Sequence, residues 1–82
     1  MRRILLAEDE DAIRDFVVIN LKRAGYDVVE TPDGERALEA FERENGNFSV
    51  VLLDVMMPGI DGFEVCKRIR EKNHRIGIIM LT

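Results

Sequence analysis

The stretch VVLLDVMMPGIDG, residues 50–62, decides the fold of this chain. It opens with four aliphatic residues, continues with Asp54, and reaches a turn at Pro58 and Gly59. A short apolar run bounded by turn residues is typical of a strand that is buried on both faces of a parallel sheet. An aspartate directly after such a strand lies at the rim of an apolar core, where burial disfavours a charge.

Apolar runs of strand length recur at residues 4–7, 28–29, 50–53 and 76–81, and helical patterns separate them. The second helical pattern opens at Asp33 and ends near residues 45–46, and the third follows Asp61. Short strands that alternate with helices predict right-handed crossovers and a parallel sheet. The 82 residues therefore predict one open α/β domain, with no linker or repeat dividing it.

The first helical pattern carries more apolar surface than one contact with a sheet requires. We expect its N-cap at Asp11 and its end at Gly25. The stripe expected to face the sheet comprises Ile13, Phe16, Val17, Leu21 and Ala24. Ala12 and Ile19 widen this stripe sideways, which suggests that an element covering them is missing and that both side chains are left toward water.

Composition narrows the possible partners and the cellular location. Sixteen acids and twelve bases give a net charge of -4, which argues against general affinity for nucleic acid or an anionic membrane and favours a cation or a basic protein surface. No apolar run approaches the roughly 20 residues of a membrane span. The single cysteine, Cys66, cannot form an internal disulfide, so we expect a cytoplasmic protein.

Acidic residues gather at the predicted carboxyl ends of the strands. Glu8 and Asp9 follow the first run, Asp54 follows the third, and Thr82 follows the fourth. Because the carboxyl ends of parallel strands meet at one rim, we expect these side chains to share a site. Clustered carboxylates either raise the pKa of one member or bind a cation, and hard oxygen ligands suit Mg2+ or Ca2+.

Magnesium fits this pattern better than calcium. The carboxylates are few, an open rim can keep waters around the ion, and no calcium-loop spacing is present. A cation beside a free carboxylate suits phosphate chemistry, which makes Asp54 a candidate nucleophile. Two simpler interpretations stay open: the acids at residues 8–11 could stabilise a helix N-terminus, and Asp54 could merely end a strand.

Three motifs in this order, ILLAEDE, LLDVMMPGIDG and IIMLT, together resemble the receiver domain of two-component response regulators over all 82 residues. The resemblance implies a flavodoxin-like parallel sheet of order 2-1-3-4-5, of which this chain would form 2-1-3-4 with three helices. It implies a phosphoacceptor signalling module rather than an enzyme. Asp54 would accept a phosphoryl group from a sensor histidine kinase and thereby switch a protein-interaction surface.

The resemblance also assigns roles to single residues. Asp9 and Asp54 would ligate Mg2+ directly, Glu8 would act through a water, and the main-chain carbonyl of Met56 would complete the protein ligands. Thr82 would be the switch hydroxyl that turns toward the phosphoryl group. The glycine at residue 62 would let the third helix begin close to the sheet.

The chain ends before the family's fourth helix, fifth strand with its lysine, and fifth helix, so the resemblance implies the N-terminal part of a receiver domain. A binding-only or non-functional receiver fragment is therefore an alternative. An aspartyl-phosphate phosphatase is another, but such enzymes carry DxD after the first strand, where this chain has EDE; a flavodoxin fits less well still. Residues 76–81 form an uncharged strand, and we expect its edge to pair with a second copy as a homodimer.

Overall fold

The computed structural model describes residues 2–81, which form a four-stranded sheet and three helices. In chain order these are β1 (Arg3–Ala7), α1 (Asp11–Arg23), β2 (Asp27–Thr31), α2 (Gly34–Arg43), β3 (Val50–Asp54), α3 (Gly62–Lys72) and β4 (Gly77–Leu81). Neighbouring strands pair parallel in the order β2-β1-β3-β4. None of the described helices is long and apolar enough to cross a membrane. The predicted flavodoxin-like fold class and strand order are confirmed.

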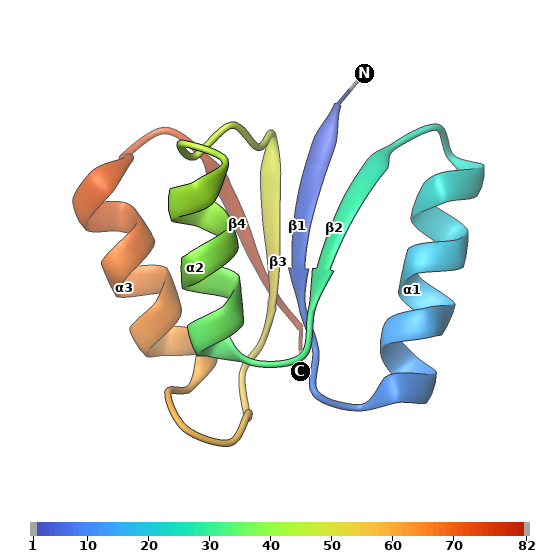
Figure 1. The fold of residues 1–82 in the computed structure, drawn as a ribbon, viewed down its shortest axis with the longest axis horizontal. Coiled ribbons are helices and arrows are strands. Elements are labelled where there is room, and N and C mark those ends of the chain that lie inside the picture. Colours follow the sequence, from blue (N-terminus) through green and yellow to red (C-terminus); the bar gives the residue numbers. More distant parts are fainter. Residues whose placement is uncertain (1, 82) are drawn as a thin grey trace.

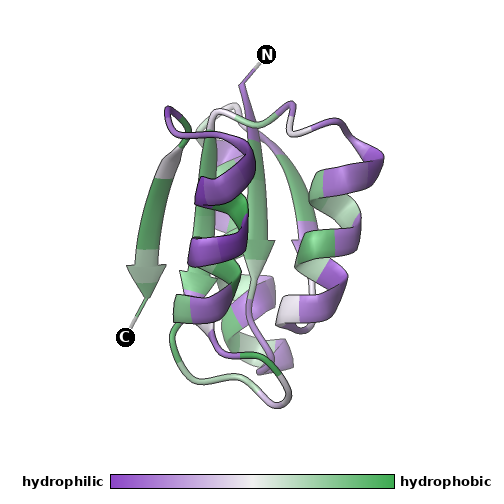
Figure 2. Ribbon diagram, turned by 90° about the vertical axis from the view of Figure 1, so that its left-hand side faces the viewer, coloured by the Kyte–Doolittle hydropathy of each residue, from purple (hydrophilic) through white to green (hydrophobic). Residues whose placement is uncertain are grey.

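The helices cover the two faces of the sheet unequally. Figure 1 shows α2 and α3 together on one face and α1 alone on the other. The main core lies under α2 and α3, where Leu5, Val51, Leu53, Val65 and Ile69 are fully buried. Burying one such side chain contributes about 1.5–3 kcal/mol. This core fixes β1 and β3 as rigid central strands, and Figure 2 shows hydrophobic colouring along much of the sheet and hydrophilic colouring over large parts of the helices.

The face under α1 is only partly covered, which corrects one prediction. Residues 50–53 were expected to be buried on both faces, but Val50 and Leu52 are only partly buried, and Ile79 of β4 is 53% exposed. The reason is geometric: α1 packs mainly against β2, so no helix among residues 2–81 covers β3 and β4 on this side.

The orientation of α1 also differs from the prediction. Val18, outside the expected stripe, is the buried side chain of this helix, whereas Ile13 and Phe16 are 43% and 69% exposed. The prediction that these two residues face the sheet is therefore wrong. Both line the open space beside β3 and β4 that the single helix leaves uncovered. Ala12 and Ile19 lie exposed, as expected.

Side-chain caps define where two of the helices begin. Asp33 before α2 and Asp61 before α3 each accept a hydrogen bond from the backbone N–H three residues on, at 2.8 and 2.9 Å. Such caps contribute about 1 kcal/mol each. The predicted cap at Asp11 is wrong: Asp11 is the first helical residue of α1, and Glu10 occupies the cap position without a side-chain bond.

Gly62 lets α3 begin in direct contact with the end of β3, as predicted. A Cβ atom at this position would overlap the carbonyl oxygen of Asp54. The Gly62 N–H donates to the carbonyl of Val55 at 2.9 Å, which folds the loop after β3 back onto the strand. The close approach therefore depends on the missing side chain and holds the backbone around Asp54 in place.

We predict that Gly62→Ala lowers the free energy of unfolding by about 1–3 kcal/mol, because the added methyl group forces the loop away from β3. Gly77→Ala is the matched control: its Cβ would meet Val50 at an ordinary 3.5 Å, and the change should stay within about 0.5 kcal/mol. Urea unfolding followed by circular dichroism measures both. Equal costs would show that the contact between Gly62 and Asp54 is not the constraint.

Candidate functional site

The register of the sheet places three carboxylates at one rim. Ala7 of β1 pairs with Leu53 of β3, so the next residues, Glu8 after β1 and Asp54 at the last position of β3, lie side by side at the edge of the sheet. Asp9 is next along the chain. One carboxylate oxygen from each of these three acids lies within 4.8 Å of the others. The structure thus brings together the acidic residues for which the sequence predicts a shared site.

Burial differs sharply within this cluster. Glu8 is 4% exposed, Asp54 is half-buried, and Asp9 is exposed. Burial raises the pKa of Glu8, and the negative charge of Asp54 raises it further, although a 3.1 Å hydrogen bond from the Glu10 N–H lowers it. Without a cation the negative charges of the cluster therefore repel one another, and the ionised form is costliest for the buried Glu8.

The donor set fits Mg2+. Within residues 2–81 no lysine or arginine forms an ion pair with Glu8, Asp9 or Asp54, so their charge is left without a side-chain counterion. A few carboxylates at an open rim suit Mg2+, which keeps several waters. Ca2+ is usually held by more protein oxygens than Mg2+, which binds through one or two carboxylates and its own waters, so a cluster of three carboxylates at an open rim fits Mg2+ better.

The carboxylates open into a cavity of about 670 Å³. Apolar side chains of α1 and β4, including Phe16 and Leu81, form its other wall. Met56, which is 80% exposed, lines the same cavity, so its loop lies beside the acids. The role of its main-chain carbonyl as a metal ligand stays a prediction. Thr82 lies outside the described residues, and its predicted role stays a prediction too.

Arg14 is a neighbour of the site that the sequence interpretation missed. Its Nη1 donates to the main-chain carbonyl of Glu8 at 2.9 Å, its Nη2 pairs with Asp11 at 2.6 Å, and its Nε lies 3.4 Å from Glu30. The pair with Asp11 was visible as an i, i+3 spacing in the sequence. The contacts with Glu8 and Glu30 were not, because they depend on how β1 and β2 lie beside α1.

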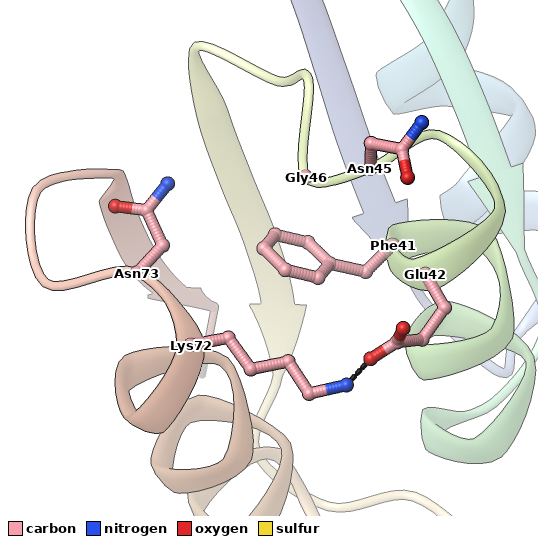
Figure 3. Close-up of a pocket in the computed structure, with 6 residues that line it drawn as sticks. All are labelled: Phe41, Glu42, Asn45, Gly46, Lys72 and Asn73. Atoms are coloured by element: carbon pink, nitrogen blue, oxygen red, sulfur yellow. Dashed lines mark ion pairs between the residues drawn. The ribbon is translucent and has the colours of Figure 1, made fainter.

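A second, smaller cavity of about 180 Å³ lies at the opposite end of the sheet, between the C-terminal ends of α2 and α3 (Figure 3). Phe41 forms one wall, and an ion pair joins Lys72 to Glu42 across the opening. The remaining lining consists of Asn45, Gly46 and Asn73. Because its charges already neutralise one another, this cavity offers no group poised for chemistry, and the acidic rim is the candidate site.

Comparison with known proteins identifies the class to which this fold and site belong. Residues 4–82 match the family model described as the response regulator receiver domain, so the chain belongs to this family. Receiver domains are signalling modules of two-component systems, for which phosphorylation and Mg2+ are typical. The family predicted from the three motifs is therefore confirmed.

Individual relatives within this family show how similar the chain is to known response regulators. It is 43% identical over 81 residues to the alkaline phosphatase synthesis transcriptional regulatory protein PhoP of Bacillus subtilis (strain 168), covering 99% of this chain and 33% of that protein. The response regulator TrrA of Thermotoga maritima in complex with Mg2+-BeF is 43% identical, with a TM-score of 0.92 over 100% of this chain and 70% of that one.

TrrA bound to the histidine kinase ThkA superposes with a TM-score of 0.90 at 43% identity, covering 100% of this chain and 69% of that one. The chain thus spans about two thirds of these solved structures, and about a third of the length of the curated relative PhoP. The similarity therefore concerns only the part of each longer protein that this chain matches.

We predict that Glu8→Gln stabilises the metal-free protein at neutral pH, because it removes a buried charge while its amide oxygen can still accept from Glu10. The raised pKa of Glu8 means that its contribution to stability is fully present below its ordinary value of 4.5 and is lost as the pH rises through the folded-state pKa. The advantage of Glu8→Gln should therefore shrink as the pH falls toward 4.5.

Urea unfolding in EDTA across this pH range measures the difference between parent and variant. Glu71→Gln, a change at an exposed glutamate of α3, is the control. Its difference from the parent in free energy of unfolding should not shrink as the pH falls. If the difference between Glu8→Gln and the parent did not change with pH, the raised pKa assigned to the buried Glu8 carboxyl would be contradicted.

Proposed function

We propose that this chain accepts a phosphoryl group on Asp54 from a phosphohistidine of a sensor histidine kinase, in a Mg2+-dependent reaction, and so switches a protein-interaction surface. The observation that carries the proposal is the cluster of Glu8, Asp9 and Asp54 at the carboxyl rim of a receiver fold. The chain would act as a signalling module and not as an enzyme, and residues 1–82 would be the N-terminal part of a receiver domain.

The position of Asp54 suits it as the acceptor. A carboxylate oxygen of Asp54 attacks the phosphorus, the P–N bond of the phosphohistidine breaks, and its electron pair returns to the imidazole nitrogen. An acyl phosphate on Asp54 results. Mg2+ held by these carboxylates would supply positive charge to the phosphoryl oxygens, and such electrostatic stabilisation is a large part of catalysis in phosphoryl transfer. The end of a rigid central strand holds Asp54 still, and its half-exposed side chain can reach a donor.

The remaining ligands follow from the family resemblance and are part of the proposal. Asp9 and Asp54 would ligate Mg2+ directly, Glu8 would act through a water, and the Met56 carbonyl would complete the protein ligands. Thr82 supplies a hydroxyl to a phosphoryl oxygen after transfer. The close approach of three of these residues within 4.8 Å supports the set.

The proposed partner is a histidine kinase, which the complex of ThkA with TrrA supports by analogy. The net charge of -4 argues against direct contact of this segment with nucleic acid or an anionic membrane, although relatives include transcriptional regulators. The cytoplasm remains the proposed location, because a single thiol, Cys66, suits a reducing compartment.

We predict that acetyl phosphate and Mg2+ add one phosphoryl group to the chain and that Asp54→Asn prevents it. Mg2+ alone should stabilise the fold, by about 1.4 kcal/mol at ten times its Kd, since it binds only the folded site. Intact-mass measurement reads the first effect, and thermal melts with and without Mg2+ read the second.

Asp15→Asn, an exposed change on α1, is the matched control and should leave both effects in place. Identical melts for the parent with and without Mg2+ would contradict the metal site. A normal Mg2+ response without any labelling would instead favour a binding-only receiver.

A second proposed role is self-association, for which the exposed edge of β4 is the specific observation. Within residues 2–81 β4 has a neighbour on one side only, and Figure 2 shows it as a hydrophobic strand at the margin of the sheet. Gly77–Leu81 carries no charge. Such an edge is a template for pairing, and antiparallel pairing of two copies gives a closed two-fold dimer.

We predict that the 82-residue chain forms this dimer at tens of micromolar and that Ile79→Lys makes it monomeric, because a lysine on an edge strand opposes pairing. Asn47→Lys adds the same charge in an exposed loop and should remain dimeric. Light scattering after size exclusion measures the mass. A folded monomeric parent would exclude the dimer.

A further inference from the structure

We propose that Arg14 is a positioning residue for the Mg2+ site, because it holds the peptide group that joins Glu8 to Asp9. This inference rests on the proposed function, since it concerns the same site. Arg14 touches none of the proposed ligand atoms. It acts through the backbone of the loop on which two of the carboxylates lie.

That loop is short and is anchored unevenly. Residues 8–10 connect β1 to α1, and the buried Glu8 side chain accepts a hydrogen bond from the Glu10 N–H. The Asp9 side chain is exposed. Its direction therefore depends mainly on the backbone on either side of it.

The two ends of the Glu8 backbone are held by different elements. The Glu8 N–H donates to the carbonyl of Thr31 in β2 at 3.1 Å, and the Thr31 hydroxyl donates to the Leu6 carbonyl at 2.7 Å. The Glu8 carbonyl accepts from Arg14. Because a peptide group is planar, fixing the Glu8 carbonyl also fixes the N–H of Asp9 and the plane from which Asp9 departs.

Arg14 is itself held from two sides. Asp11 at the start of α1 and Glu30 in β2 contact its guanidinium, and the side chain is only 15% exposed. A guanidinium is a planar fork that can serve several acceptors at once, which a lysine ammonium does not reproduce. Arg14 thereby ties the loop to both β2 and α1.

The positive charge of Arg14, taken alone, would weaken Mg2+ binding, whereas its positioning of the loop would strengthen it. A positive group near three carboxylates disfavours Mg2+, although Asp11 and Glu30 partly neutralise it. If charge dominated, removing the guanidinium would strengthen Mg2+ binding. If position dominates, removing it weakens binding, so the two explanations predict opposite signs.

The test is calorimetric titration of Mg2+ into the parent and into Arg14→Met and Arg14→Lys, at a temperature where circular dichroism shows each to be folded. We expect Mg2+ affinity about tenfold weaker in Arg14→Met, as for other outer contacts of metal ligands. Arg14→Lys preserves the charge and the helix and should also bind more weakly. Arg36→Met removes a guanidinium that pairs with Glu39 on α2 and should bind like the parent.

The outcomes separate this inference from the proposed function. A parent that does not bind Mg2+ overturns the metal site and the role of Arg14 with it. A parent that binds, with Arg14→Met binding equally or more tightly, overturns the positioning role alone. If Arg14→Met does not fold, Arg14→Lys decides: affinity equal to that of the parent overturns the proposal, and weaker affinity at unchanged charge supports it.

Discussion

The structure depends on one electrostatic constraint, which is that parallel pairing of β1 with β3 sets acidic residues side by side at the same rim. The pairing of Ala7 with Leu53 puts Glu8 and Asp54 side by side, and a carboxylate oxygen of each lies within 4.8 Å of one from Asp9. Like charges this close repel one another, and burial makes the repulsion costlier for Glu8. A bound cation would relieve this repulsion, which is why the cluster is the candidate site for Mg2+.

The parts of the fold around the rim keep the acids from relaxing apart. The fully buried β1 and β3 residues fix the strands, Gly62 lets α3 close against the Asp54 backbone, and Arg14 holds the Glu8 carbonyl. Each contact reduces the conformational entropy of the chain, and together the contacts hold in place carboxylates that repel one another. Preorganisation of this kind is what a site for phosphoryl transfer requires.

The unequal coverage of the sheet has a different consequence. Two helices seal one face, while the single helix α1 leaves Phe16, Leu52 and Ile79 at least partly open on the other. This open face begins at the acidic rim, where Phe16 and Leu81 line the same cavity as Asp54. Under the proposed function, a phosphoryl group on Asp54 would therefore lie next to this open face, which would suit a module that converts a modification into an association.

The sequence by itself determined the strand and helix order, the parallel sheet, and the gathering of Glu8, Asp9 and Asp54, because alternating periods and strand-end positions depend only on local pattern and topology. Tertiary structure alone decided the rest. Which side of α1 faces the sheet depends on where the helix lies over it, so Val18 is buried and Phe16 is not. The contact of Arg14 with Glu8 and Glu30 likewise requires β1, β2 and α1 to meet, and no spacing along the chain encodes that meeting.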